Sequence, residues 1–405
     1  MHKVVSVIWI GAALILIEFS QAKSKFINPV QFPSGWIIQA DSISDGFNDI
    51  EALDTLTAWV VGALNSKPVV FHTTDGGLQW LQQSATSLSD WQATGVSFPD
   101  KRHGWVVGTS EFYYLTTLDG GQSWQELIYP NRFRAIQVHF VDSLTGWIVG
   151  HLDTILYTSD GGQNWSKQVV GNYRGNLLDV HFVNSLYGWV AGGNASPDNS
   201  SLILKTTDGG STWQRFPGLF SPSHVAVDLL GTSNAWFSGF VGGFIFTSDG
   251  GATWEDTTLP GAGNNNYTGI SFIDPLRGWV VGTGGFLRGE ILRTIDGGHS
   301  WSFEVKDSLV PLRRIAMLDD RHGWAVGEYG LILKYDPPVV LGDLNLDSQI
   351  TSADIVLELN RVFLGQAFLS PELSGDVNCD SAFSPADVVL LLLRVFVQSD
   401  FPCTR

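Results

Sequence analysis

The stretch TSDGGQNW, Thr158 to Trp165, recurs along the chain and decides its fold. Five close copies share its pattern of Thr, any residue, Asp, Gly, Gly, two variable residues and Trp: Thr73–Trp80, Thr117–Trp124, Thr206–Trp213, Thr247–Trp254 and Thr294–Trp301. The Gly pair supplies the positive φ angles of a tight turn, and the Asp carboxylate accepts hydrogen bonds from the backbone N–H groups of that turn. The Trp packs where the next strand begins. Six copies of one hairpin corner predict a repeat architecture.

A second repeated block, typified by Gly-Trp-Val-Val-Gly at Gly104–Gly108, gives the period. Seven copies follow one another at spacings of 42 to 47 residues. Before each block lies an alternating apolar stretch such as Val96–Phe98, and after it a further stretch such as Ile155–Thr158 enters the corner. The alternation predicts strands, and the Trp after the corner begins a fourth strand. Four short strands per period are typical of a β-propeller blade.

The tryptophans give the number of blades. Of 16 Trp, seven lie in the Gly-Trp blocks and six in the corners. Trp36 lies in the segment Pro33–Gln39, which resembles a corner and a fourth strand without the three strands before it. The last period, Ile315 to Tyr335, has three strands and lacks a corner. We therefore predict an all-β, seven-bladed propeller whose N-terminal strand closes the last blade.

The N-terminal 22 residues have the pattern of a secretory signal, with Lys3 at the start, an apolar core from Val4 to Ile17 and small residues around Ser20 to Ala22. A retained membrane anchor is the alternative, and the absence of a Cys after the core excludes bacterial lipidation there. We expect a secreted protein, extracellular or associated with the cell surface, without a membrane span in the mature chain. The net charge of −17 makes nucleic acid an unlikely partner.

The repeat pattern stops at the double proline that begins at Pro337. We expect a propeller over residues 23–336, a linker over 337–342 and a second domain over 343–405. That domain contains two related segments, offset by 33 residues, with oxygen-bearing residues at the spacing of a calcium loop. The expected ligands are Asp343, Asn345, Asp347, the Gln349 carbonyl, Thr351 and Asp354 in the first loop, and Asp376, Asn378, Asp380, the Ala382 carbonyl, Ser384 and Asp387 in the second. Two Asx turns that cap helices are the alternative.

The paired loops, each followed by one apolar helix, resemble the type I dockerin family. The resemblance implies a small all-α domain folded around two calcium ions, with a cohesin module as its partner. It places the cohesin-recognition positions at Ser352, Ala353, Pro385 and Ala386. From the residues alone, the two cysteines, Cys379 and Cys403, either form one disulfide or remain free thiols.

The repeated corners match the Asp-box (BNR) motif, and with the Gly-Trp blocks they resemble the propeller family of photosystem II assembly and stability factors. The resemblance implies that the corner aspartates are structural and that function lies on the opposite face. Loops there carry residues suited to a glycan or peptide ligand: Trp91, Arg132, Arg134, Tyr173, Arg174, His224, Tyr267, Arg313 and Arg314.

The sequence contains no recognisable catalytic constellation, so no catalytic residue is assigned. Acids on the candidate face are scattered singly among the blades, whereas most glycosidases need a pair. His139 and His181 share one column beside the channel and are expected to be structural. We therefore expect an exported, non-catalytic binding or scaffold propeller, held to a cohesin-bearing scaffold or cell surface by its calcium-dependent dockerin. The alternative is a polysaccharide-acting glycoside hydrolase of the sialidase or glucanase type.

Overall fold

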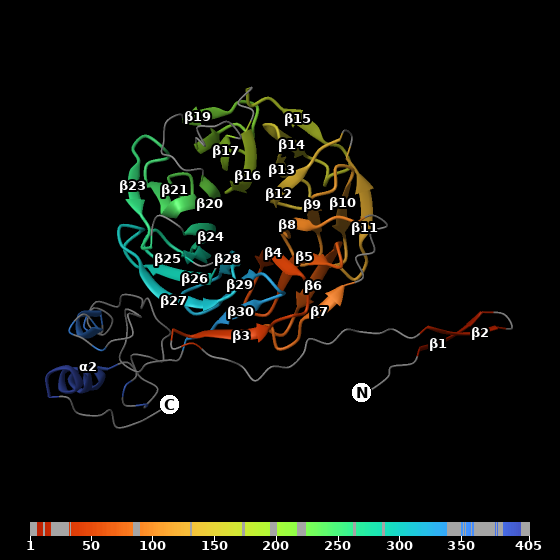
Figure 1. Cartoon of the computed structure of the whole chain (residues 1–405). Helices are drawn as coiled ribbons and strands as arrows, with labels where there is room; N and C mark the ends of the chain where they lie inside the picture. Colours follow the sequence, from red (N-terminus) through yellow and green to blue (C-terminus); the bar gives the residue numbers. More distant parts are fainter. Residues whose placement is uncertain are drawn as a thin grey trace. The chain divides into compact units, whose positions relative to one another are not determined.

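The computed structural model divides the chain into two compact units, Met1–Asp336 and Pro337–Arg405. It describes residues 6–10, 13–17, 32, 34–83, 90–129, 132–171, 175–194, 201–216, 224–261, 265–285, 288–337, 350, 352, 354–357, 359, 377, 379 and 384–397. Within the first unit, seven four-stranded antiparallel sheets surround a central axis (Figure 1). The seven-bladed propeller predicted from the repeats is therefore confirmed.

The blades are numbered 1 to 7 in chain order, and the first strand of each is the innermost. Blades 1 to 3 are formed by β4 (Gly46–Ala52), β5 (Ala58–Leu64), β6 (Lys67–Thr73), β7 (Leu81–Gln83); β8 (Ala93–Ser97), β9 (Gly104–Gly108), β10 (Tyr113–Thr117), β11 (Gln125–Ile128); and β12 (Ala135–Phe140), β13 (Gly146–Gly150), β14 (Thr154–Thr158), β15 (Ser166–Gln168). Blades 4 to 6 are formed by β16 (Gly175–Phe182), β17 (Gly188–Asn194), β18 (Ser201–Thr206), β19 (Gln214–Phe216); β20 (His224–Leu230), β21 (Asn234–Gly239), β22 (Gly243–Thr247), β23 (Glu255–Thr258); and β24 (Asn266–Phe272), β25 (Gly278–Gly284), β26 (Arg288–Thr294), β27 (Ser302–Leu309).

Blade 7 joins the two ends of the propeller sequence. Its strands are β28 (Leu312–Met317), β29 (Gly323–Gly327), β30 (Ile332–Tyr335) and, from the N-terminal side, β3 (Trp36–Ala40). β3 pairs with β30 in antiparallel register, with Trp36 opposite Tyr335. The predicted closing strand is therefore confirmed, and it covers an edge that β30 would otherwise leave unpaired.

The six corners share one hydrogen-bonding scheme, which Asp119 illustrates. One oxygen of its carboxylate accepts from the Thr117 hydroxyl at 2.8 Å and from the Ser123 backbone N–H at 2.9 Å, and the other accepts from the Ser123 hydroxyl at 2.6 Å. Gly120 and Gly121 have φ angles of 73° and 86°, which glycine alone adopts without strain. The bonds from Ser123 lower the pKa of Asp119 to about 2. The corner aspartates hold turns, as predicted.

The Gly-Trp blocks connect each blade to the next. Trp59 stacks on Phe98 of blade 2 at 3.8 Å between ring centroids, and its Nε1–H donates to the Gly120 carbonyl of that blade's corner at 3.3 Å. The pairs Trp105–Phe140, Trp147–Phe182 and Trp236–Phe272 repeat this stacking at 3.5, 3.5 and 4.0 Å. One blade buries its Trp only against the next, which explains why the repeat folds as a ring.

In the second unit, Ser384 is the N-cap residue of helix α2 (Pro385–Leu392) (Figure 1). The Ser384 hydroxyl accepts from the Ala386 N–H at 3.2 Å, and Asp387 accepts from the Ser384 N–H at 2.9 Å, which together form a capping box. A π-helical segment, Leu393–Val397, follows. The described part of this unit thus contains one of the predicted helices in full, and residues 354–357 are helical as well.

The calcium-loop predictions fall mostly outside the described residues. Of the twelve ligands, the structure describes Asp354, Ser384 and Asp387, and the aspartates are both fully buried. Of the recognition positions it describes Ser352, Pro385 and Ala386, which are exposed, but not Ala353. Cys379 is disulfide-bonded. The other cysteine, Cys403, lies outside the described residues, so its pairing with Cys379 stays a prediction.

The residues predicted to form a secretory signal contain two described strands, β1 (Ser6–Ile10) and β2 (Ala13–Ile17), which pair antiparallel to each other. No helix within the described ranges is long and apolar enough to cross a membrane.

Candidate functional site

The central channel is lined by the seven innermost strands, and each of these strands carries a β-bulge at the same place. The register shifts fall between Phe47/Asp49, Ala93/Gly95, Ala135/Gln137, Leu177/Asp179, His224/Ala226, Tyr267/Gly269 and Leu312/Arg314. A bulge turns the following side chain away from its regular direction. We call the seven residues after the shift the bulge ring: Asp49, Gly95, Gln137, Asp179, Ala226, Gly269 and Arg314. Two residues further on lies the second ring: Glu51, Ser97, His139, His181, Asp228, Ser271 and Ala316.

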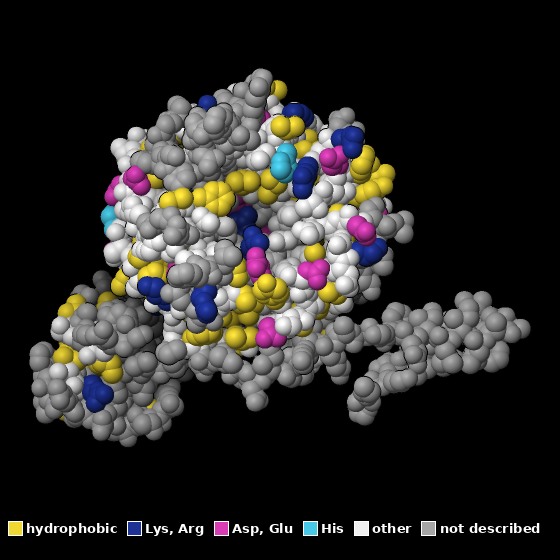
Figure 2. Space-filling model, viewed as in Figure 1, with side chains coloured by type: hydrophobic (Ala, Val, Ile, Leu, Met, Phe, Trp, Pro, Cys, Tyr) yellow, Lys and Arg dark blue, Asp and Glu magenta, His cyan; other side chains and the backbone are white. Residues whose placement is uncertain are grey.

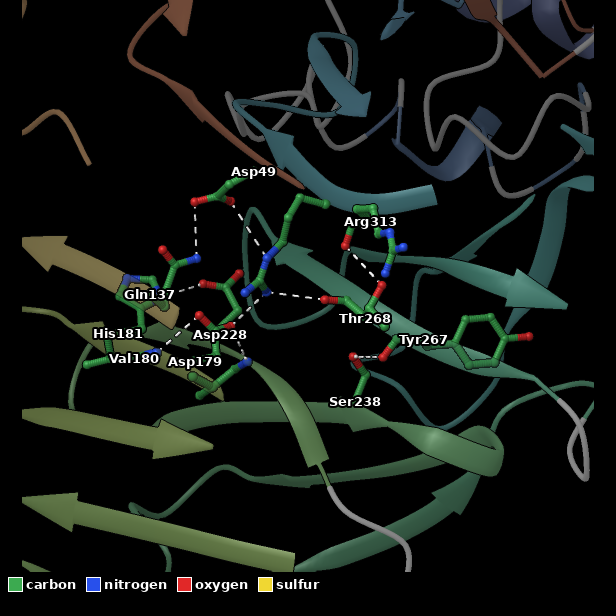
Figure 3. A network of polar contacts seen from close by, with 12 residues as sticks. Asp49, Gln137, Asp179, Val180, His181, Asp228, Ser238, Tyr267, Thr268 and Arg313 are labelled. Atoms are coloured by element: carbon green, nitrogen blue, oxygen red, sulfur yellow. Dashed lines mark hydrogen bonds and ion pairs between the residues drawn. The ribbon is translucent and has the colours of Figure 1, made fainter. Parts of the chain in front are cut away.

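Arg314 connects distant blades across the bulge ring. Its Nη1 donates to Asp179 of blade 4 at 3.0 Å and to the Thr268 carbonyl of blade 6 at 3.2 Å, and its Nε lies 3.6 Å from Asp49 of blade 1. Gln137 donates to the same Asp49 carboxylate at 3.1 Å (Figure 3). One guanidinium therefore compensates part of the negative charge of two buried carboxylates, which lie on opposite sides of a cavity of about 330 Å³.

Small residues of the bulge ring make room for the long ones. A Cβ at Gly269 would lie 2.9 Å from the Cα of Arg314, and one at Gly95 would lie within overlap distance of the Gln137 amide. Long and short side chains therefore fit together around the ring.

The second ring links neighbouring blades by hydrogen bonds. Five of its seven side chains bond to the inner strand of the next blade: Ser97 Oγ accepts from Phe140 N at 3.0 Å, His139 Nε2 donates to Phe182 O at 2.9 Å, His181 Nδ1 lies 3.0 Å from Asp228 Oδ1, Asp228 Oδ2 accepts from Phe272 N at 2.6 Å, and Ser271 Oγ accepts from Met317 N at 3.0 Å. These contacts support the structural role predicted for the two histidines.

Burial shifts several pKa values in the channel. It raises the pKa of Glu51 to about 8, with a further contribution from the charge of Asp49. It also raises the pKa of Asp49 to about 6, although Arg314 opposes this shift. The pKa of His139 falls to about 3, because burial and the neighbouring His181 both disfavour its charged form. His139 is therefore a neutral imidazole at physiological pH.

Three residues of the predicted ligand face prove to be core residues. Trp91 belongs to the apolar cluster between blades 1 and 2, His224 is fully buried and bonds to the Ser201 hydroxyl at 2.8 Å, and Tyr267 donates to the buried Glu290 at 3.0 Å. Their prediction as ligand contacts needs correction, because loop position does not determine side-chain direction. Arg314 likewise points into the channel, and Tyr173 and Arg174 lie outside the described residues.

Arg132, Arg134 and Arg313 are exposed where the prediction placed them. Arg132 pairs with Glu111 at 2.7 Å and lies over the Phe112 ring at 5.1 Å. Arg313 pairs with Glu328 at 2.9 Å.

Arg313 and Glu328 also border a cavity of about 160 Å³ between blades 7 and 1, together with Asp45, Asn48 and Gln92. Basic and acidic side chains lie together around the central opening of the propeller (Figure 2). We call this opening the mouth of the channel, and it offers both positive and negative charges to a polar ligand.

Acids on the same side of the propeller are engaged internally where the structure describes them in detail. Asp153 accepts from the Gly175 N–H at 2.8 Å, and Glu290 accepts from the side chains of Asn265 and Tyr267 at 2.9 and 3.0 Å. Within the described ranges, no group of three or more His, Cys, Asp or Glu is arranged to hold a metal ion.

Comparison with known proteins shows what the propeller sequence is similar to. Residues 29–133, 82–172 and 124–219 match the family model of the photosynthesis system II assembly factor YCF48. The matches together span blades 1 to 4, slightly less than half of the chain. A stretch of 106 residues is 32% identical to the photosystem II assembly lipoprotein Ycf48 of a Synechocystis strain, and this stretch spans 25% of the chain and 30% of that relative.

Solved structures share the fold. A structure of YCF48 bound to a D1 peptide superposes with a TM-score of 0.61 at 21% identity and covers 75% of this chain and 97% of the other. YCF48 from Cyanidioschyzon merolae gives 0.60 at 21% identity, over 75% and 99% of the two chains. A xyloglucanase from Xanthomonas campestris gives 0.58 at 13% identity, over 75% and 54%. At these identities the likeness concerns the fold alone.

The matches overturn the function expected from the sequence. The prediction of a scaffold propeller attached to a cohesin-bearing protein is wrong, because the matched family model and the curated relative are both photosystem II assembly factors. The prediction was drawn from the C-terminal loops, whereas the family similarity lies in the propeller. The relatives with sequence similarity are named as assembly factors, which favours a binding role over the hydrolase alternative.

Proposed function

We propose that this chain is a YCF48-type assembly propeller that binds an extended peptide segment of a client protein. The observation that carries the proposal is the family match through blades 1 to 4. The fold supports it, because nearly the whole of a YCF48 bound to a D1 peptide superposes on this propeller. A propeller of this kind presents a rigid face to its ligand, and rigidity reduces the entropic cost of binding.

The mouth of the channel is the proposed peptide site. Exposed Arg132, Arg134 and Arg313 lie in the loops there, and two of them are held in place by Glu111 and Glu328. A peptide backbone or acidic side chain would accept hydrogen bonds from these guanidinium groups. Because Arg314 crosses the channel to Asp179, the peptide lies over the mouth and does not thread through the ring.

Fluorescence anisotropy with a labelled D1-derived peptide and the full chain tests this function. We expect saturable binding that weakens as salt rises, and a roughly 12- to 160-fold loss in Arg313→Ala, which corresponds to the ~1.5–3 kcal/mol of a hydrogen bond to a charged group. The matched control is Arg102→Ala, since Arg102 is exposed in a turn near the Gly120 corner, at the other end of blade 2. Absence of saturable binding, or an equal loss in Arg102→Ala, contradicts the proposal.

We also propose that residues 343–405 bind calcium through the two loops that resemble those of dockerins. Asp354 and Asp387, at the last ligand position of each loop, are fully buried carboxylates of the kind that a hard cation requires. Asp387 also accepts bonds from Ser384, so the capping role and the ligand role share one side chain. When bound, calcium would neutralise carboxylates that otherwise repel one another.

Isothermal titration with Ca²⁺ tests the second proposal. We expect the full chain to bind calcium with a stoichiometry of about two, as paired loops require. Asp343→Ala and Asp376→Ala should each remove one site. Asp160→Asn, in an exposed corner of the propeller, should leave calcium binding unchanged. Retention of both sites in the double loop variant would exclude these ligands.

The expected secretion stays a proposal that rests on Lys3 and the apolar run Val4–Ile17. N-terminal sequencing of the exported protein tests it. A new N-terminus close to residue 23 supports the proposal, and an intact Met1 in exported material contradicts cleavage.

A further inference from the structure

Two neighbouring members of the second ring, His139 on β12 and His181 on β16, lie side by side on the channel wall. Their ring centroids are 4.8 Å apart and their planes are tilted by 44°. Both residues line the cavity of about 330 Å³. Each ring uses one nitrogen in its contact to the next blade, and the second nitrogen of each ring decides what the pair can bind.

Each imidazole is oriented through one nitrogen. His139 Nε2 lies 2.9 Å from the Phe182 carbonyl, and because a carbonyl only accepts, Nε2 carries the proton and Nδ1 carries a lone pair. His181 Nδ1 lies 3.0 Å from the Asp228 carboxylate, so Nδ1 donates and Nε2 carries the lone pair. Asp228 is itself fixed by the Leu229 and Phe272 N–H groups at 2.8 and 2.6 Å.

The remaining nitrogens, His139 Nδ1 and His181 Nε2, are open to the channel. Neither has a hydrogen-bond partner within the described part of the chain, and neither belongs to the buried side-chain polar atoms that lack one. Metal-binding histidines commonly donate their other N–H to a carboxylate or a backbone carbonyl, which fixes the tautomer. Here His181 donates to the Asp228 carboxylate and His139 donates to the Phe182 backbone carbonyl.

The spacing suits one ion. A histidine nitrogen binds Zn²⁺ at about 2.0–2.1 Å, which puts each ring centroid ~3.2 Å from the metal. For two rings that direct their free nitrogens at one ion, a centroid separation of 4.8 Å corresponds to a ligand angle of roughly 100°. That angle is close to tetrahedral. The Asp228 carboxylate, which contacts His181 on the same cavity wall, favours a cation at this place.

We propose that His139 and His181 form a binding site for a divalent late transition metal, such as Zn²⁺, with water in the remaining positions. Imidazole nitrogen suits Zn²⁺, Cu²⁺ and Ni²⁺, whereas Ca²⁺ and Mg²⁺ prefer oxygen. Because no third His, Cys, Asp or Glu within the described ranges completes the set, the site is exchangeable and weaker than a structural zinc centre. Asp228 acts as the positioning residue of His181.

Titration of the full chain with Zn²⁺, in excess Ca²⁺ to occupy oxygen sites, tests the proposal. We expect His139→Gln and His181→Gln each to weaken Zn²⁺ binding at least about 10-fold, and Asp228→Asn by about 10- to 100-fold.

Matched controls are His103→Gln and His322→Gln. Each of these histidines pairs with an aspartate, at 2.8 and 2.9 Å, in a turn outside the channel. Equal Zn²⁺ affinity in the channel variants and the wild type, or an equal loss in the controls, overturns the proposal.

A second measurement uses the wild-type chain and does not depend on folding of the variants. Of nine histidines, two should show Zn²⁺-dependent shifts of their ring carbon–proton signals in NMR spectra. The control variants exclude two other origins of these shifts, because His103→Gln and His322→Gln should each remove a different signal and leave the two that shift. Shifts confined to other histidines, or no shift at all, overturn the proposal.

Discussion

Replacement of Trp36 with Ala should open the seam that closes the propeller. Trp36 is fully buried, packs on Tyr335 at 4.9 Å between ring centroids, and donates its Nε1–H to the Glu304 carboxylate at 2.8 Å. Loss of a buried Trp side chain costs ~3–5 kcal/mol. The hydrogen bond to a charged group adds ~1.5–3 kcal/mol, although Trp279 still donates to Glu304 at 3.2 Å. We expect a loss of roughly 4–7 kcal/mol, a large part of the ~5–15 kcal/mol that stabilises a typical protein.

Urea unfolding followed by circular dichroism measures this loss, and a pair of conservative variants separates its parts. Trp36→Phe keeps most of the burial and removes the bond to Glu304. Trp80→Phe is the matched control, because Trp80 is 1% exposed and donates to the neutral amide of Gln39 at 3.3 Å. The seam variant should lose ~1 kcal/mol more than the control, the usual difference between charged and neutral acceptors. An equal loss in both variants, or an unchanged stability of Trp36→Ala, would refute the reasoning.

Three further predictions concern the channel and the corners. Burial raises the pKa of Glu51 to about 8, so the folded state binds this proton more tightly than the unfolded state, and stability falls as pH rises from about 4.5 to about 8. Glu51→Gln should therefore melt higher than the wild type at pH 8 and equally near pH 4; parallel pH profiles would contradict this. Asp119→Ala removes the acceptor of three hydrogen bonds in the turn, so it should lower the free energy of unfolding in urea by ~0.5–2 kcal/mol. Asp119→Asn should lose an intermediate amount, and a loss as large as that of Asp119→Ala would argue against the turn bonds as the cause. Gly269→Ala places a Cβ against Arg314 and should lower the free energy of unfolding by ~1–3 kcal/mol. Gly285→Ala is the control, because its Cβ would lie in open space, and it should change stability by less than ~0.5 kcal/mol. Equal effects of the two substitutions would show that the bulge ring tolerates the added methyl group.

The number of blades could be predicted because its signals are local. A Gly pair at positive φ and a Trp at fixed spacing mark each corner, and Trp36 without its first three strands indicates the closing strand. These features depend on residues close together in the sequence, so they can be recognised without knowledge of the tertiary structure.

The channel could not be predicted in the same way, because one residue more per inner strand changes which side chains face inward. The shift between Leu312 and Arg314 turns Arg314 into the channel, although its neighbour Arg313 stays on the face. The sequence does not show the direction of a side chain either, so the prediction placed Trp91, His224 and Tyr267 on the exposed face although they are buried in the core. A pattern read from loops alone contains no information on a bulge in the following strand.

The bulge ring also shows which charges the fold does not need. Gly95, Ala226 and Gly269 occupy three of its seven positions, so a blade folds without a polar side chain there. The charged members, Asp49, Asp179 and Arg314, are therefore additions to a blade that is complete without them, and each contacts a blade other than its own. Arg314 also donates to the Thr268 carbonyl, and the backbone carbonyl of Arg313, the preceding residue, accepts from the Thr268 hydroxyl at 3.0 Å. The interior network and the exposed loop that carries Arg313 therefore share one strand edge.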